Sequence, residues 1–367
     1  MLRAMNQQGS KRNGLGGWWR LAAALVLTAA VTVLPATAQT APQPPTPAAR
    51  KVTTLQAVRE RGFLICGATS PLPGFAQQDT EGKWSGFDVD LCRAIAAAVF
   101  GDPDKIEFRA LRGEARFAWL QTGVVDVLTR NGAWSQRRDT LYGASFVAPS
   151  FFDGQAFMVP QSLGVVSAYE LDNISVCVVD TGSELDRMEE FFFSNQAAYS
   201  EVLYEDAADL AIAYRAGLCE AVSATGRQLQ AIRRDLPEPA SHRILPERIS
   251  KELLGPFVRT GDDQWFDIVR WTIFTLIDAE ELGITSLNID SLEATRTAGV
   301  RRILGLDGDF GTAMGLSPKF MTDIIRAVGN YSELYDRHFG PQTGAALLRG
   351  QNALWSNGGL LYAPPIR

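Results

Sequence analysis

The sequence predicts an α/β protein that contains two similar modules, and three observations support this prediction. Of the 367 residues, 46% are hydrophobic and 21% are charged, an ordinary globular composition that excludes a coiled coil, a collagen-like rod and a fully disordered chain. Strand-like apolar runs alternate with helical patterns, which is typical of a mostly parallel sheet with helices on both faces. The alternation stops in the aromatic-rich stretch Ser145 to Pro160 and then starts again. By length alone, two domains or one large domain remain open.

The first module follows residue 55. We expect its helices at 55–61, 88–100 and 114–121, and its strands at 63–67, 106–111 and 125–129. The second of these helices has Leu91, Ile95 and Val99 at helical spacing, and it ends at Gly101 before Pro103. The three strands and the helices between them form a β-α-β-α-β pattern.

The second module repeats this pattern. We expect its strands at 174–179, 201–204 and 220–224, and its helices at 184–194, 206–216 and 226–235. Extended connections join the two modules, which suggests two lobes with a cleft between them. In open α/β sheets, ligands lie beyond the carboxyl ends of the strands, and here those ends would face the cleft.

We expect lobe one to comprise residues 51–157 and 253–367, and lobe two to comprise residues 158–252. The two hinge crossings are expected near Gln155–Pro160 and Leu253–Arg259. A helix from Trp265 to Ala279 should pack its apolar face on lobe one.

The N-terminal segment has the composition of a secretory signal peptide. Four basic residues and no acid accompany an apolar run from Leu21 to Leu34, followed by a small-x-small cleavage site that ends at Ala38. We therefore predict a signal peptide over 1–38 and a periplasmic mature protein; an uncleaved N-terminal anchor is the alternative. Residues 39–50 are rich in proline and should form a spacer.

Removal of the predicted signal peptide makes the chain more acidic. Four of the 35 basic residues and none of the 41 acidic residues lie in that segment, so the mature chain has a net charge of about −10. Non-specific binding to nucleic acid or to an anionic membrane requires positive charge. We therefore expect no nucleic-acid partner.

The four cysteines predict two disulfides. The chain has no Cys-x-x-Cys pair and only two histidines, His242 and His338, which argues against a zinc site and against histidine-dependent catalysis. Cys66 lies in a predicted strand and Cys92 on the apolar face of the helix that follows it, so the two should meet. By the same reasoning Cys177, inside a strand, should pair with Cys219, which opens the next strand. Four buried reduced thiols are the alternative.

Six separated stretches resemble one known family. They are LICGATSPLPGFA, WSGFDVDLCRAIAAAVFGDP, VDVLTRNGAWSQRRDT, DGQAFMV, LGPFVRTGDDQWFDIVRW and NALWSNGGLLYAPPIR. The chain is similar here, from about residue 52 to 367, to the periplasmic general L-amino-acid-binding proteins of ABC importers, in family 3 of the solute-binding proteins. The resemblance implies a two-lobed periplasmic binding protein fold of type II. It also implies capture of an amino acid or a related small carboxylate by hinge closure, delivery to an inner-membrane ABC permease, and no cofactor.

The resemblance also implies the ligand site. Its residues here would be Thr69, Phe75, Asn131, Ala133, Trp134, Arg138, Asp180, Gly182, Ser183 and Thr225. Arg138 would hold the ligand α-carboxylate, because a guanidinium matches a carboxylate in shape and keeps its charge on burial. A solvated helix start is the alternative for Arg137 and Arg138. The helix that begins after Gly182 and Ser183 could bind an anion at its N-terminus, although such sequences often only cap helices.

Three positions depart from the family pattern. Thr225 stands where relatives have an aspartate that receives the ligand α-ammonium, and Gly132 and Ala133 stand where relatives have two threonines. A buried ammonium that lacks its carboxylate typically costs about 3–5 kcal/mol. Three explanations remain open. Another acid could replace the aspartate, Asp180 being the nearest; the ligand could lack a free ammonium; or the protein could have lost amino-acid affinity and act as a scaffold or sensor.

An enzyme is the remaining alternative. The same fold occurs in dehydratases, and a carboxylate such as Asp180 or Glu184 could serve as a general acid or base. The sequence otherwise contains no catalytic motif, so we expect a binding protein.

Overall fold

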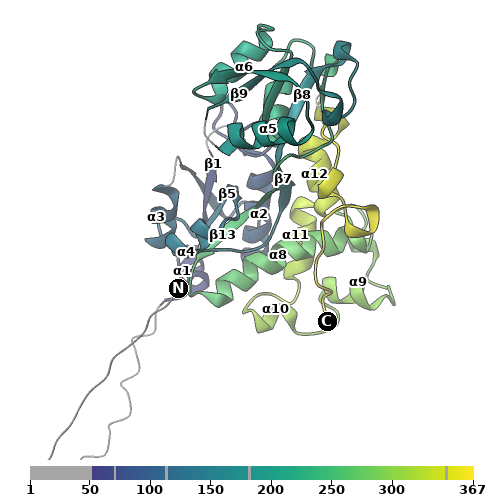
Figure 1. The fold of residues 1–367 in the computed structure, drawn as a ribbon. Helices are drawn as coiled ribbons and strands as arrows, with labels where there is room; N and C mark the ends of the chain where they lie inside the picture. The colour runs from purple at the N-terminus through teal and green to yellow at the C-terminus, as the bar shows by residue number, and fades with distance from the viewer. Residues whose placement is uncertain (1–51, 70–71, 112–114, 181–182, 344–345) are drawn as a thin grey trace, which may run out of the picture. The chain divides into compact units, whose positions relative to one another are not determined.

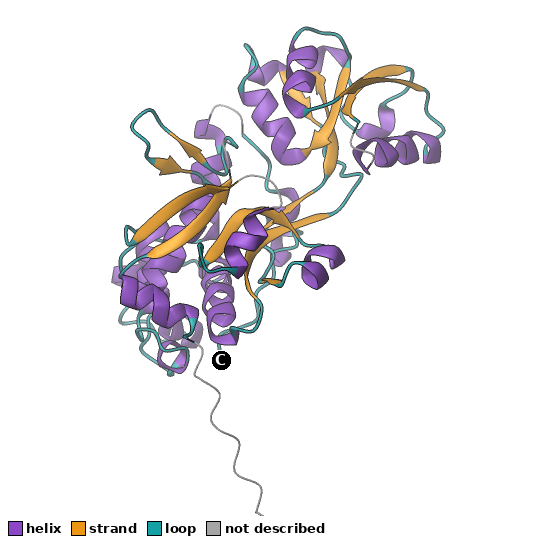
Figure 2. Cartoon of the chain, turned by 90° about the vertical axis from the view of Figure 1, so that its left-hand side faces the viewer, coloured by secondary structure: helices purple, strands orange, loops and turns teal. Residues whose placement is uncertain are grey.

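The computed structural model describes residues 52–69, 72–111, 115–180, 183–343 and 346–367 (Figure 1). The predicted signal peptide and proline-rich spacer lie outside these residues. Two β-sheets with packed helices form the described chain, together with a short hairpin of β2 (Gln77–Gln78) and β3 (Trp84–Ser85) (Figure 2). None of the described helices is long and apolar enough to cross a membrane.

The first sheet has the order β4-β1-β5-β13-β6, and β7 also pairs with β13. Its parallel strands are β1 (Leu64–Thr69), β4 (Ile106–Leu111) and β5 (Val127–Ala133). The antiparallel additions are β6 (Ala144–Phe146), β7 (Phe151–Asp153) and β13 (Glu252–Arg259). The helices of this part are α1 (Thr54–Arg61), α2 (Phe87–Phe100), α3 (Ala115–Gln121) and α4 (Gln136–Leu141).

The second sheet has the order β10-β9-β11-β8-β12. Its parallel strands are β9 (Ile174–Val179), β10 (Tyr199–Tyr204) and β11 (Ala221–Thr225), and its antiparallel strands are β8 (Gln155–Pro160) and β12 (His242–Ile244). The helices are α5 (Ser183–Ser194), α6 (Ala207–Arg215) and α7 (Gly226–Arg234). Each sheet is therefore mixed, with three parallel strands as the module pattern predicts and the connecting strands added antiparallel.

The C-terminal third is helical and packs on the first sheet. Its helices are α8 (Asp263–Glu281), α9 (Ala298–Ile303), α10 (Phe310–Ala313), α11 (Phe320–Val328) and α12 (Tyr331–Phe339). Short 3-10 helices lie at Gln161–Leu163, Ala168–Glu170, Pro239–Ser241, Ile289–Ser291, Pro341–Thr343, Gly350–Asn352 and Trp355–Asn357. One core joins α2, α8, α11 and α12, as expected for the apolar face of α8. Trp265 is fully buried in this core, and its indole Nε1–H donates to the Asp126 carbonyl at 3.0 Å.

Each predicted disulfide is confirmed. Cys66 bonds Cys92 between β1 and α2, with a Cα–Cα distance of 6.3 Å, and Cys177 bonds Cys219 beside the second sheet, with 5.7 Å. The described chain has no free cysteine. Each bridge lies within the part of the chain that builds one sheet.

The chain passes between the sheets at two adjacent places. The outward passage is the short link from β7 to β8, and the return passage is the segment between β12 and β13. Gln155 N–H donates to Ser250 Oγ at 2.9 Å and Ile249 N–H donates to the Gln155 carbonyl at 2.8 Å, so the two passages are hydrogen-bonded to each other. A side chain at Gly154 would collide with the Ser250 carbonyl, which explains the glycine between the two sheets.

These passages lie beside the segments in which hinge crossings were expected. Gln155–Pro160 is β8 of the second sheet, and Leu253–Arg259 belongs to β13 of the first sheet. Ladder hydrogen bonds hold a strand in its sheet, so each of these segments is a fixed part of one sheet. The second sheet begins at Gln155, three residues before the expected limit of lobe two.

Candidate functional site

Part of the expected site gathers where β5 ends. Ala133 is the last residue of β5, and its carbonyl accepts a 2.7 Å hydrogen bond from Arg138 Nη1. Arg138 lies in the first turn of α4, a helix whose N-cap hydroxyl, Ser135 Oγ, accepts from the Arg138 N–H at 3.3 Å. The partly exposed guanidinium is therefore placed at the carboxyl end of a parallel strand, where open α/β sheets bind ligands.

Trp134, the residue after Ala133, adds an aromatic surface. Its ring is about half exposed and stacks on Phe146 with centroids 4.9 Å apart, and its Nε1–H donates to Asp139 Oδ2 at 2.6 Å. Its backbone N–H donates to the Leu253 carbonyl at 2.8 Å. Asn131 is also in β5, and Thr69 ends the neighbouring β1.

Phe75 lies elsewhere. It is fully buried and packs against the rings of Phe87, Phe151 and Phe339, with centroids 6.2, 5.0 and 4.8 Å away. These contacts place the side chain in the core under the first sheet. The apolar sequence around Phe75 is compatible both with a core position and with a ligand-contacting position, so it did not distinguish the two.

The remaining expected residues belong to the second sheet. Asp180 follows β9 and is exposed, and its N–H donates to the Tyr204 carbonyl at 2.8 Å. Ser183 is the first residue of α5, and Gly182 lies outside the described residues. Thr225 ends β11 and is 3% exposed. Its hydroxyl donates to Gln228 Oε1 at 2.5 Å, and its N–H donates to the same oxygen at 3.0 Å.

A largely buried charge cluster beside Thr225 was not predicted from the sequence. Arg227 Nη1 donates to Asp153 Oδ2 at 3.1 Å and to Glu252 Oε2 at 2.6 Å, and the Arg227 N–H also donates to Asp153 Oδ2 at 3.1 Å. Arg227 comes from α7, whereas the two carboxylates come from β7 and β13 of the first sheet. The cluster therefore links the sheets at the two passages.

The environment of this cluster perturbs its acids. Burial raises the pKa of Asp153 despite the attraction of Arg227. Burial, and then the Glu252 carboxylate, raise the pKa of Glu184 in the first turn of α5. The Arg227 pKa is raised because Glu252 and Asp153 outweigh the effect of burial. The sequence feature that could have indicated this cluster is Asp153, an acid inside an otherwise aromatic and apolar stretch.

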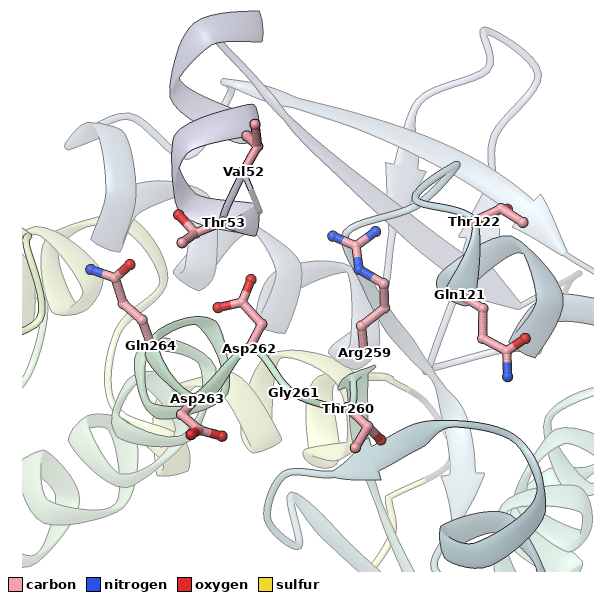
Figure 3. Close-up of a pocket in the computed structure, with 10 residues that line it drawn as sticks. All are labelled: Val52, Thr53, Gln121, Thr122, Arg259, Thr260, Gly261, Asp262, Asp263 and Gln264. Atoms are coloured by element: carbon pink, nitrogen blue, oxygen red, sulfur yellow. The ribbon is translucent and has the colours of Figure 1, made fainter. Parts of the chain in front are cut away.

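A separate cavity of about 460 Å³ lies at the opposite end of β13 from Glu252 (Figure 3). Arg259 Nη2 donates there to Thr54 Oγ1 at 2.7 Å, and Asp262 accepts from the Thr54 and Trp265 N–H groups at 2.7 and 3.1 Å. These contacts fasten α1 to the start of α8. None of the residues expected in the ligand site lines this cavity.

Residues 64–285 match the model of the bacterial extracellular solute-binding proteins, family 3. The chain belongs to this family. Within the described residues, this solute-binding protein gathers no group of three or more histidine, cysteine, aspartate or glutamate side chains that could hold a metal ion.

The similarity of this solute-binding protein to its relatives extends over nearly the whole length of each relative. It is 44% identical to the general L-amino acid-binding periplasmic protein AapJ of Rhizobium johnstonii, over 87% of this chain and 94% of that one. It is 46% identical to the glutamate/glutamine/aspartate/asparagine-binding protein BztA of Rhodobacter capsulatus, over 87% and 95%. A solved periplasmic binding protein of an ABC transporter from Brucella ovis, with glutathione bound, superposes with a TM-score of 0.76 at 41% identity, covering 86% of this chain and 100% of that one. The predicted family and two-lobed α/β fold are confirmed.

Proposed function

We propose that this protein is the periplasmic substrate-binding component of an amino-acid ABC importer. It would capture an amino acid or a related small carboxylate and deliver it to a membrane permease. The observation that supports this most is the similarity over nearly the full length of relatives whose names describe amino-acid binding and ABC transport. Export by the segment 1–38, with cleavage after Ala38, would place the protein in the periplasm.

In this proposal Arg138 binds the ligand α-carboxylate. Its guanidinium is oriented by the carbonyl of Ala133, the residue before the half-exposed Trp134. The expected contributions of Thr69 and Asn131, at the ends of neighbouring parallel strands, agree with this position. The start of α5, near Ser183, and the turn at Thr225 would contribute from the second sheet.

Ligand capture would close the two lobes about the paired passages between the sheets. Lobe one would contain the first sheet and the C-terminal helices, and lobe two the second sheet. Within the described residues, two short segments join these parts, so rotation requires few backbone changes. Closure would exclude water from the ligand and create the form that the permease binds.

The test is isothermal titration calorimetry on residues 39–367. The probes are the twenty common L-amino acids, their N-acetyl derivatives and glutathione. One-to-one binding of any of these probes supports the proposal. Absence of heat with all of them, together with turnover of a prephenate-like substrate, would replace it with the enzyme alternative.

A further inference from the structure

Gln155 is a fully buried side chain whose hydrogen-bonding capacity is only partly used. Its Nε2 donates to the Glu184 carbonyl at 2.8 Å and to Ser223 Oγ at 3.0 Å. Its Oε1 has no hydrogen-bond partner among the described residues. An unsatisfied buried acceptor destabilises a fold. The unused Gln155 Oε1 therefore suggests that a bound ligand supplies the missing hydrogen-bond donor.

This acceptor lies at the ligand-binding edge of the second sheet. Gln155 is the first residue of β8 and is the register partner of Thr225, the last residue of β11. Its bond to the Glu184 carbonyl also joins it to the first turn of α5, the helix that follows β9. The carboxyl ends of β9 and β11 therefore converge on Gln155, next to the position where relatives have the ammonium-binding aspartate.

The same place gathers charges of both signs. Glu252 acts on the carboxylates of Asp153 and Glu184, and the cations that act on these acids include Arg227 and Arg187. Arg227 is bonded to Asp153 and Glu252, which leaves Glu184 as the acid that is not ion-paired with it. Arg248 is also near, and its Nη1 donates to the backbone carbonyls of residues 245–247.

We propose that the Glu184 carboxylate and Gln155 Oε1 receive the α-ammonium of the ligand, in place of the aspartate that is missing at position 225. This inference rests on the proposed function and specifies its ligand class as amino acids or small peptides with a free α-ammonium. An ammonium donates three hydrogen bonds and carries a positive charge. It would satisfy the unused acceptor and pair with the Glu184 carboxylate in one step.

Two further features agree with this assignment. The pKa of Glu184 is raised by burial and by Glu252, a state that a bound cation would reverse. Thr225 is not available as an acceptor of comparable strength, because it is neutral and its hydroxyl donates to Gln228. Asp180, the acid that the sequence suggested, is exposed and lies between the end of β9 and the start of α5.

The test compares matched variants by calorimetry. L-Glutamine, L-glutamate and glutathione are the probes, and N-acetyl-L-glutamine and glutarate are their counterparts without an ammonium. We expect the wild type to bind at least one of the first three probes and to bind neither counterpart. E184Q should weaken that binding by about 100-fold, because a neutral amide replaces the charged partner of the ammonium. E190Q, the same change at an exposed position of α5, should alter affinity less than about twofold.

A second variant guards against misfolding of E184Q. Q155M keeps the approximate volume of the side chain and removes the acceptor, so it should also weaken binding of the ammonium probes. Thermal unfolding of each variant without ligand identifies a folding defect. If E184Q and Q155M fold and bind like the wild type, or if the wild type binds only the counterparts without an ammonium, this inference is wrong while the proposed function stands. If the wild type binds none of the twenty amino acids, their N-acetyl derivatives, glutathione or glutarate, the proposed function fails as well.

Discussion

Arg138 combines a local contact with the ligand role that we propose for it. Its Nη1 is oriented by the Ala133 carbonyl, and the residue remains partly exposed at the end of β5. A guanidinium carries its five N–H donors in a planar fork that matches a carboxylate.

Replacing Arg138 should therefore separate binding from stability. We expect Arg138→Ala to lower affinity for any carboxylate probe by at least about 100-fold, because the charge-assisted bonds to the ligand are lost. The free energy of unfolding without ligand should change by less than about 1 kcal/mol. Calorimetry and thermal unfolding measure the two effects, and Arg137→Ala at the neighbouring exposed position is the control. Marked destabilisation of the ligand-free variant would instead make Arg138 a structural residue.

Thr225 offers a second prediction for a single residue. Thr225→Asp should increase affinity for free L-amino acids by about tenfold or more, since it adds a carboxylate at the edge of the second sheet. The Gln228 amide, whose Oε1 now accepts from Thr225, can rotate so that its Nε2 donates to the new acid. Thr225→Asn, which is uncharged, is the control for calorimetry. Equal affinities of the two variants would mean that charge at this position does not contribute.

At the scale of elements, α8 contains an acid that its burial disfavours. Asp278 is 7% exposed, and its Oδ2 has no hydrogen-bond partner among the described residues. Burial, and then Glu281, raise its pKa from 3.8 to about 7. The folded protein therefore holds this proton more tightly than the unfolded chain does. The contribution of this proton to the free energy of unfolding is complete below about pH 4 and is lost as the pH rises to about 7.

Asp278→Asn should remove this dependence. At pH 8 we expect the variant to be more stable than the wild type by about 2 kcal/mol, within an upper value of about 4 kcal/mol that the pKa change allows. At pH 4 the difference should fall below about 1 kcal/mol, because the folded side chain is then protonated and the unfolded one is about half protonated. Urea unfolding at both pH values measures the effect, and Asp267→Asn on the same helix is the control. A difference that does not depend on pH would contradict the assignment.

Most elements of the two modules were predictable from the sequence. The strand and helix patterns predicted β4 and β9 with their observed bounds, and the other strands and helices of the modules within a few residues. Hydrophobic periodicity and glycine breaks act locally, so they are visible without tertiary information. The antiparallel strands β6, β7 and β12 are three residues long and form by pairing with distant strands, so the sequence contains too little local signal for them.

On the scale of the whole molecule, the two disulfides constrain each sheet separately. Cys66–Cys92 closes a loop with a sequence separation of 26 and Cys177–Cys219 one of 42. Neither bridge joins the first sheet to the second, so neither should oppose closure of the lobes.

Mass spectrometry of the exported protein should show the loss of four hydrogens relative to the reduced chain. Peptide mapping should recover only the two observed pairs. Reduction should cost roughly 3–4 kcal/mol per bridge by loop-closure reasoning. It should leave ligand affinity little changed at temperatures where the reduced protein stays folded. A bridge that joins a cysteine of the first sheet to one of the second would contradict the arrangement.

The sequence by itself determined the two α/β modules, the cysteine pairs and the family, because repeated local patterns and collinear motifs are properties of the chain. The resemblance also implies that Thr225 replaces an acid. Only the tertiary structure decided that Phe75 is a core residue and that Asp153, Arg227 and Glu252 form one charge cluster around the buried Asp153. The same is true of Gln155, whose unused oxygen lies beside Thr225. These groups come from segments far apart in the chain, and burial and charge pairing between such segments depend on how the chain folds back on itself.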